Sequence, residues 1–207
     1  MVQIFIEAKR LATPEGCFLQ TIIKRFIPES KSYEIIPTDG WTNLFCETNV
    51  MKFISNSDTG GENLVIFDAD YPEKENGGYE NRLKVLKEKL AEKGVTDAHI
   101  FLWPDNESDG DFETLLESLA RKELYQEYFD CFDDYEKCIA GPKDANGINK
   151  YHWPNQKARM YTYISSMQLS KKQRDRLSYD WLFEDNKYWY LDSEKLAFVV
   201  AFLKSYL

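Results

Sequence analysis

The sequence predicts an α/β protein with a central parallel sheet of about four strands, flanked by helices and followed by a mostly helical C-terminal extension. Short apolar runs alternate with helical patterns over the first 120 residues, which is typical of parallel β-α-β units. The run LVIF at 64–67 is continuously apolar, as expected of a strand buried on both faces. No convincing strand pattern follows residue 120.

The strands and helices of the first part are expected in the following order. Strands are expected at residues 3–6, 32–36, 64–67 and 99–103. Pro14 suits a first helical turn, and apolar residues recur at helical spacing from there to about Phe26. A second helix is expected over about 41–54, and a third around 83–90, closed by Gly94 as its C-cap.

The C-terminal part is expected to be helical near residues 122–138, 155–168 and 193–206. The stretch GPKDANGIN at 141–149 gathers turn-forming residues and is the best candidate for a linker. In the last helix the apolar residues follow the spacing of a buried face, which predicts docking onto the preceding domain. The chain therefore divides into an α/β domain, residues 1–120, and a helical extension packed on it, residues 121–207.

Composition bounds the class of protein. The chain of 207 residues is 43% hydrophobic and 15% aromatic, so it can bury a sizeable core. It has no apolar run of about 18 residues and its N-terminus lacks a signal-peptide pattern, which predicts a cytoplasmic protein with no membrane partner. The four cysteines lack C-x-x-C spacing, which favours buried reduced thiols over a zinc site.

Charge is distributed unevenly along the chain. The net charge of −9 opposes simple nucleic-acid binding. Residues 105–136 hold twelve acids and two bases, whereas residues 143–176 hold eight bases and two acids. Either the two segments form surfaces with different functions, or they face and neutralise each other.

Aromatic residues are interleaved with the bases of the second segment: Tyr151, Trp153, Tyr161 and Tyr163. Cations and aromatic rings together suit single-stranded nucleic acid, whose bases stack and whose phosphates pair with cations. Aromatic residues at helical spacing also pack protein cores. The sequence leaves both interpretations open.

Acidic residues follow the predicted strands at the edge where parallel sheets bind ligands. Glu7 follows the first strand, and Asp68 and Asp70 follow the third. Side chains alternate along an extended chain, so Asp68 and Asp70 are expected to point to one side. Their repulsion would be relieved by a divalent cation with oxygen ligands; the alternative is that Asp is simply common where a strand turns into a loop.

Three segments together resemble the Toprim domain of topoisomerases, bacterial primases, small ribonucleases and nucleases of the overcoming-lysogenisation-defect type. They are FIEAK at 5–9, VIFDAD at 65–70 and GDFETLL at 110–116. The layout is most similar to short stand-alone Toprim-like proteins of uncharacterised function, and the resemblance covers about residues 1–120. The chain departs from the family pattern at Ala8, where the family has Gly, and at Lys9 and Arg10, where it often has an acid.

The resemblance implies a Toprim-like (Rossmann-like) sheet and metal-dependent phosphodiester chemistry on DNA or RNA with Mg²⁺ or Mn²⁺. Glu7 would be a metal ligand or general base, and Asp68 and Asp70 would hold one ion. Asp111 and Glu113 would help to hold a second ion, and two ions can stabilise both the attacking and leaving oxygens of a phosphodiester. Glu113 is equally interpretable as a first-turn helix acid.

A phosphoryl-transfer site also needs a cation supplied by the protein. Lys157 is the catalytic candidate, and Lys9, Lys157 and Arg159 are the substrate-binding candidates. Lys157 is otherwise interpretable as an exposed helix lysine. The alternative function is a non-catalytic Toprim-like module that binds nucleotide, nucleic acid or a protein.

Overall fold

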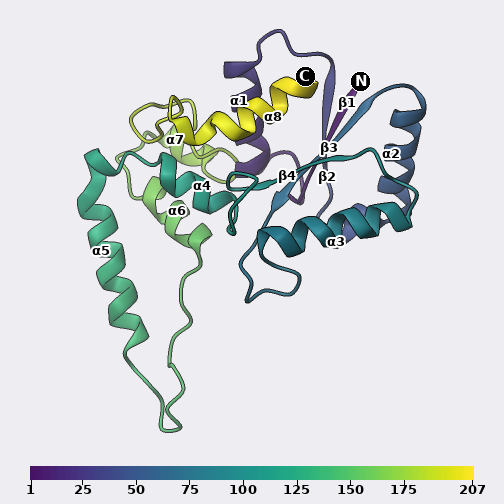
Figure 1. Ribbon diagram of the computed structural model, residues 1–207. Helices are drawn as coiled ribbons and strands as arrows, with labels where there is room; N and C mark the ends of the chain where they lie inside the picture. The colour runs from purple at the N-terminus through teal and green to yellow at the C-terminus, as the bar shows by residue number, and fades with distance from the viewer.

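The central feature of the computed structural model, which describes residues 1–207, is one sheet of four parallel strands (Figure 1). The strands are β1 (Val2–Ile6), β2 (Tyr33–Pro37), β3 (Glu62–Asp68) and β4 (His99–Trp103), in the order β2-β1-β3-β4. All three neighbouring pairs are parallel. The predicted α/β class is confirmed, and each predicted strand lies within two residues of an observed one.

The two central strands are buried on both faces, which explains their continuous apolar sequences. In β1, Ile4 pairs with Leu64 of β3, and Phe5 pairs with Val65. Because side chains alternate along a strand, Ile4 and Leu64 belong to the larger of two hydrophobic cores. Phe5 and Val65 belong to the smaller core on the opposite face.

Helices cover both faces of the sheet (Figure 1). The larger core contains residues of α1 (Pro14–Phe26), α4 (Phe112–Leu119) and α8 (Ala197–Tyr206). The smaller core contains residues of α2 (Glu47–Asp58) and α3 (Tyr79–Glu92). Each helix buries an apolar stripe against the sheet, which is the usual source of helical stability in a globular protein.

Two helices show how local sequence sets their boundaries. Helix α1 begins and ends as predicted, and the hydroxyl oxygen of Thr13 caps it by accepting a hydrogen bond from the Gly16 N–H at 3.3 Å. The helix predicted over 41–54 is divided into η1 (Trp41–Phe45) and α2. The division falls at Cys46, whose extended backbone interrupts the helical path.

The C-terminal extension packs on the sheet face that α1 covers. It comprises α5 (Lys122–Ala140), α6 (Gln156–Ser165), α7 (Lys171–Arg176), η2 (Glu194–Leu196) and α8. Met160, Tyr163 and Trp189 belong to the same core as Ile4 and Trp103. The extension is therefore helical, as predicted, although α7 was not foreseen.

An arm projects from the body of the protein (Figure 1). It consists of α5 and the return segment, residues 141–155, which connects α5 to α6. The predicted linker 141–149 lies at its tip, where Lys143 and Asn149 form an isolated bridge. Every residue from 141 to 150 is exposed.

The composition led to two expectations, one about membrane-spanning helices and one about the cysteines. No helix combines the length and apolar character that a membrane crossing requires. All four cysteines are free thiols, but Cys46, Cys131 and Cys138 are exposed and Cys17 is half-buried. The prediction of buried thiols is therefore wrong, because these positions lie outside the apolar stripes that pack the two cores.

Candidate functional site

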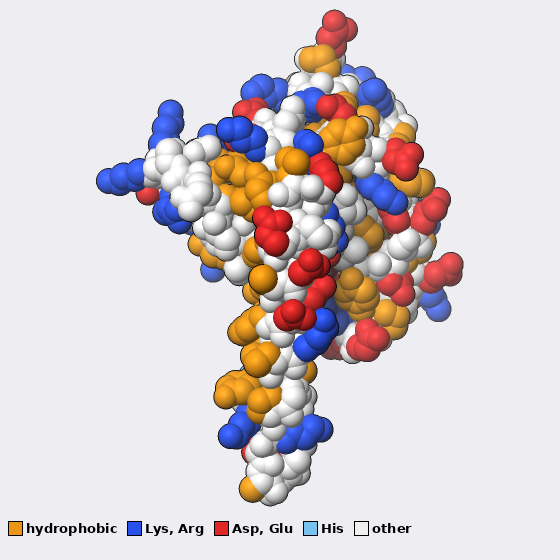
Figure 2. Space-filling view, turned by 90° about the vertical axis from the view of Figure 1, so that its left-hand side faces the viewer, with side chains coloured by type: hydrophobic (Ala, Val, Ile, Leu, Met, Phe, Trp, Pro, Cys, Tyr) orange, Lys and Arg blue, Asp and Glu red, His pale blue; other side chains and the backbone are white.

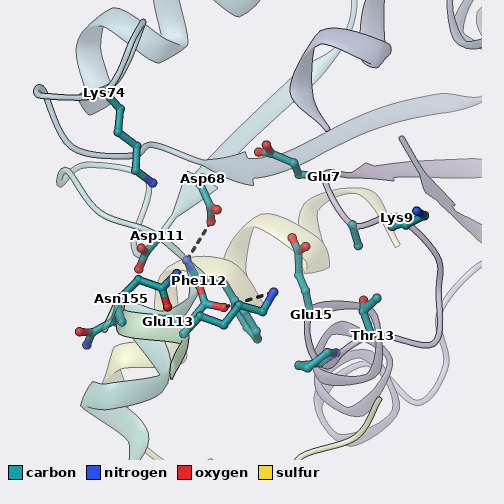
Figure 3. A pocket seen from close by; sticks show the side chains of 14 residues that line it. Glu7, Lys9, Thr13, Glu15, Asp68, Lys74, Asp111, Phe112, Glu113 and Asn155 are labelled. Carbon is teal, nitrogen blue, oxygen red and sulfur yellow. Dashed lines mark hydrogen bonds and ion pairs between the residues drawn. The ribbon is translucent and has the colours of Figure 1, made fainter. Parts of the chain in front are cut away.

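An acidic cavity opens at the carboxyl-terminal edge of the sheet (Figure 3). Its volume is about 430 Å³, and only two of its 14 lining residues are hydrophobic. The lining comes from the ends of β1 and β3 and from the starts of α1, α4 and α6. Parallel sheets bind ligands at this edge because the strand-to-helix loops gather there.

Five carboxylates line this cavity, and we call them the acidic cluster: Glu7, Glu15, Asp68, Asp111 and Glu113. They come from segments that are far apart in the sequence. In Figure 3 the carboxylates of Glu7, Glu15 and Asp68 face a common space from three directions. Four of the five predicted acids are therefore brought together, with Glu15 as an addition.

The ends of two strands position Glu7 and Asp68. Glu7 directly follows β1, and Asp68 is the last residue of β3. One carboxylate oxygen of Asp68 accepts a hydrogen bond of 2.8 Å from the backbone N–H of Phe112. This N–H is one of the donors that the first turn of α4 leaves free, so the helix start fixes the orientation of Asp68.

The start of α4 positions the other two predicted acids. Asp111 is the N-cap, and its Oδ1 accepts hydrogen bonds from the N–H of Thr114 at 2.9 Å and from its hydroxyl at 2.8 Å. Glu113 lies in the first turn and is buried. Its Oε1 is 4.0 Å from the Nζ of Lys157.

Glu15 is a site residue that the sequence interpretation missed. It lies in the first turn of α1, and its Oε1 accepts a hydrogen bond of 3.1 Å from the indole N–H of Trp103. A usable signal was present, because a helix that follows a parallel strand begins at the edge where that strand ends. Burial raises the pKa of Glu15 to about 8, and the charges of Glu7 and Glu113 contribute.

Four acids of the cluster, Glu7, Glu15, Asp68 and Glu113, are poorly solvated and lie near other acids, and the pKa of each is raised. Burial is the largest cause in every case. It raises the pKa of Asp68 well above the ordinary value, aided by the charges of four neighbouring acids. Burial also raises the pKa of Glu7, with help from Asp70, and the pKa of Glu113, with help from Asp111.

Three lysines also line the cavity: Lys9, Lys74 and Lys157. Lys9 and Lys157 were predicted, whereas Lys74 lies in a loop that carries no periodic signal. Figure 3 shows the amine of Lys74 directed toward the acids and that of Lys9 directed away from them. Burial lowers the pKa of Lys74, but its hydrogen bond to Asp70 and the nearby acids outweigh burial and raise the pKa overall.

Asp70 does not line the cavity, in contrast to the prediction that it shares a metal with Asp68. Its two carboxylate oxygens are paired with Lys74 and with the buried guanidinium of Arg82 on α3. The backbone of Asp70 has φ of 59°, so the side-chain alternation expected of an extended chain ends there. Asp68 and Asp70 therefore contact different partners.

Arg159, predicted to bind substrate, is also placed elsewhere. Its guanidinium is buried and forms ion pairs with Asp133 at 2.6 Å, and with Glu117 and Glu136 at 3.5 Å. The acidic and basic segments thus neutralise each other at this point, as one of the two interpretations of the charge pattern proposed. Arg159 thus links α6 to α4 and α5 through these ion pairs.

The acidic cluster fits a hard divalent cation in its chemistry. All its donors are carboxylate oxygens, which Mg²⁺ and Mn²⁺ prefer. The Oε2 atom of Glu7 is buried without a hydrogen-bond partner, which is costly unless something binds it. As arranged, no three acids form a ready coordination shell, so binding an ion requires side-chain rotation.

The fold and this cavity define an α/β protein with an acidic site at the carboxyl edge of a parallel sheet. A family model described as "Protein of unknown function (DUF3226)" matches residues 15–207, and the chain belongs to this family. The matched region includes every member of the acidic cluster except Glu7. No curated protein and no solved structure matches the chain.

Proposed function

We propose that the acidic cavity binds Mg²⁺ or Mn²⁺ and that the protein carries out metal-dependent phosphodiester chemistry on nucleic acid. The observation that carries this proposal is the convergence on one cavity of five buried or half-buried carboxylates from four segments: the ends of β1 and β3 and the starts of α1 and α4. Burial, and then the charges of neighbouring acids, raise the pKa values of Glu15 and Asp68. The motifs that resemble the Toprim domain contribute four of the five acids. This resemblance also supports metal-dependent phosphodiester chemistry.

The acids of the cluster have distinct roles in this proposal. Glu7, Glu15 and Asp68 face a common space and would hold one ion. Asp111 has a carboxylate oxygen that takes no part in the α4 cap, and with Glu113 it would help to hold a second. A bound divalent cation would polarise phosphate oxygens and lower the pKa of a bound water.

The lysines would orient the substrate. The side chain of Lys157 is 65% exposed at the cavity and is 4.0 Å from the nearest carboxylate oxygen of Glu113, so a phosphate can compete for it. Lys74 extends over the acids from the opposite side (Figure 3). Two cations on either side of the acidic cluster would pair with the phosphates that flank a scissile bond.

A non-catalytic binding module is the second candidate function. Lys74 and Lys157 reach the acidic cluster, and their amines supply part of the positive charge that a metal would otherwise supply. No three acids are arranged as a coordination shell. These two observations favour a site that binds a phosphate-bearing ligand through lysines, with no chemistry.

Metal binding distinguishes the two functions. Isothermal titration calorimetry with MgCl₂ and MnCl₂ at mildly alkaline pH would compare the wild-type chain with Asp68→Asn, which retains the oxygen that accepts from Phe112. Asp97→Asn, at an exposed acid outside the cavity, is the matched control. We expect the affinity of Asp68→Asn to fall about tenfold or more, since it loses a charged ligand, and that of the control to be unchanged.

Cleavage then tests the chemistry. Wild type, Asp68→Asn and Asp97→Asn would be incubated with single- and double-stranded DNA and RNA in each metal. We expect cleavage by wild type and the control, and its loss in Asp68→Asn. The metal-dependent function is contradicted if wild type binds neither cation, or if Asp68→Asn cleaves as fast as wild type.

A further inference from the structure

We propose that the return segment of the arm binds single-stranded nucleic acid and guides it to the acidic cavity. This inference rests on the proposed function, because it names the substrate class for that site. Three observations carry it: exposed aromatic side chains, unpaired lysines and a direct chain connection to the cavity wall.

The first observation is the exposure of two aromatic rings. Tyr151 is 55% exposed and Trp153 is 50% exposed, whereas Tyr163, from the same aromatic-rich stretch, is buried in the core. The two interpretations of this stretch thus apply to different residues. Exposed rings beside cations are the features on which bases of a single strand stack, independently of sequence.

The second observation is charge complementarity. Lys143 and Lys150 are exposed and take part in no ion pair. The only acid of the return segment, Asp144, is occupied by the loop, where its Oδ1 accepts from the N–H groups of Asn146 at 2.8 Å and Ile148 at 2.9 Å. On a chain of net charge −9, this local positive charge suits a phosphate backbone.

The two sides of the arm differ in charge. Helix α5 carries exposed acids, among them Glu127, Asp130 and Asp134, which would repel phosphates. Figure 2 shows acidic side chains gathered where the arm joins the body, with hydrophobic and basic side chains farther toward its tip. A nucleic-acid strand is therefore expected along the return segment and not along α5.

The third observation is continuity with the cavity. The return segment ends at Asn155, which caps α6 by accepting a hydrogen bond of 2.9 Å from the N–H of Ala158. Asn155, Gln156 and Lys157 all line the cavity. Two residues of chain span at most about 7 Å, so Trp153 lies within that distance of Asn155 on the cavity wall, and a strand stacked on Trp153 would lead toward the cavity.

These features favour a single strand over a duplex. In a duplex the bases are stacked on each other and their faces are unavailable to protein side chains. Tyr151 and Trp153 can stack only on bases that are unpaired or splayed. The lysines of the return segment would add affinity for the phosphates of the strand, and this affinity depends on salt concentration but not on the base sequence.

Fluorescence anisotropy with labelled single-stranded and duplex oligonucleotides tests this inference. The measurements use the full chain in EDTA, so that neither cleavage nor metal binding affects the result. We expect the Tyr151→Ala/Trp153→Ala double variant to bind single strands with a Kd raised about tenfold or more, since loss of one stacked base costs roughly 5- to 150-fold. Phe198→Ala, at a 47% exposed aromatic residue of α8, should bind like wild type.

Salt dependence tests the lysines separately. The Lys143→Ala/Lys150→Ala variant should reduce the slope of log K against log salt by about 1.4, because each contact with a single strand contributes about 0.7. Lys87→Ala/Lys93→Ala, at exposed lysines of the α3 region, should leave the slope unchanged. Because all the substituted side chains are exposed, each variant is expected to unfold at the wild-type Tm. Thermal unfolding would verify that the fold is intact.

Several results would overturn the inference. Among them are wild-type affinity of the Tyr151→Ala/Trp153→Ala variant, equal binding of duplex and single strand, and no oligonucleotide binding at all. Loss of self-association in that variant without loss of oligonucleotide binding would instead identify the segment as an interface between copies of the chain. Oligonucleotide binding without any metal binding would contradict the proposed chemistry and leave this inference standing.

Discussion

At the scale of single residues, Glu15 shows how burial sets the charge of the cavity. Its carboxyl group contacts the indole of Trp103 and lies near Glu7 and Glu113. Each of these acids makes ionisation of the others less favourable. The cavity therefore favours positive charge, which protons and the amines of Lys74 and Lys157 supply and which the proposed metal ion would also supply.

The raised pKa of Glu15 predicts that the metal-free protein loses stability as pH rises. Between the ordinary value of 4.5 and about 8, the folded chain binds more protons at this group than the unfolded chain. The free energy of unfolding should therefore fall across this window, by at most about 1.4 kcal/mol per pH unit for one group. Urea unfolding at a series of pH values measures this slope.

Glu15→Gln is the decisive variant for this prediction. It removes the titrating group but retains an oxygen that can accept from Trp103, so its slope should be shallower than that of wild type. Saturating Mg²⁺ should reduce the wild-type slope as well, because a bound cation favours the ionised acids. An identical slope for Glu15→Gln and wild type would contradict the assigned pKa shift.

The carboxylates of Asp68 and Asp70 point to different partners, and the backbone angle φ of Asp70 accounts for the difference. Asp68 ends β3 and faces the cavity, whereas the positive φ of Asp70 directs its carboxylate to Arg82. Arg82 is buried and stacks 4.8 Å above the ring of Trp41. The second acid of the D-x-D pattern therefore neutralises a buried cation.

At the scale of elements, the start of α4 connects helix stability to the cavity. Asp111 caps this helix, and the first N–H of the helix holds Asp68. The same few residues thus end the β4-to-α4 loop, begin a helix and orient two acids. Changes here should affect stability and metal binding by separable routes.

Two substitutions of Asp111 separate these routes. Asp111→Ala should lower the free energy of unfolding by about 1 kcal/mol, because it removes the cap of α4. Asp111→Asn should keep most of that stability, since asparagine also caps helices, yet it should weaken metal binding by removing a charge. Urea unfolding and calorimetry on the two variants measure the two effects; equal destabilisation by both would argue against the capping role.

At the scale of the whole molecule, the two parts of the chain share one core. Ile4 and Trp103 of the sheet pack in the same cluster as Tyr163 and Trp189 of the C-terminal extension. The indole N–H of Trp189 donates to the Trp181 carbonyl at 2.6 Å, so this buried polar group has its partner inside the cluster. The extension closes one face of the sheet.

Truncation tests this arrangement. A chain of residues 1–120 would expose the apolar sheet face that the extension covers, so we expect it to lack a cooperative thermal transition. Deletion of the exposed arm tip, residues 144–148, should retain the transition because those side chains are exposed. Circular dichroism on heating measures both, and a cooperative transition of the 1–120 chain would show that the α/β part folds independently.

The strands, most helices and four acids of the cavity could be predicted from the sequence, because each of these features depends on local chemistry. Apolar runs and helical spacing are local patterns, and strands that run parallel bring their carboxyl ends to one edge. Glu15, Lys74 and the ion pairs of Arg159 needed the structure, because they depend on packing between distant segments.

Hydrophobic periodicity decides which residues are buried, so the amino-acid pattern alone was enough to predict a parallel α/β protein with acids after its strands. Three other features became visible only in the folded chain: Asp70 pairs with Arg82, Glu15 joins the acidic cluster, and Tyr151 and Trp153 are exposed on an arm beside the cavity. The physical reason is that the charge and exposure of a side chain depend on neighbours that folding brings from elsewhere in the chain.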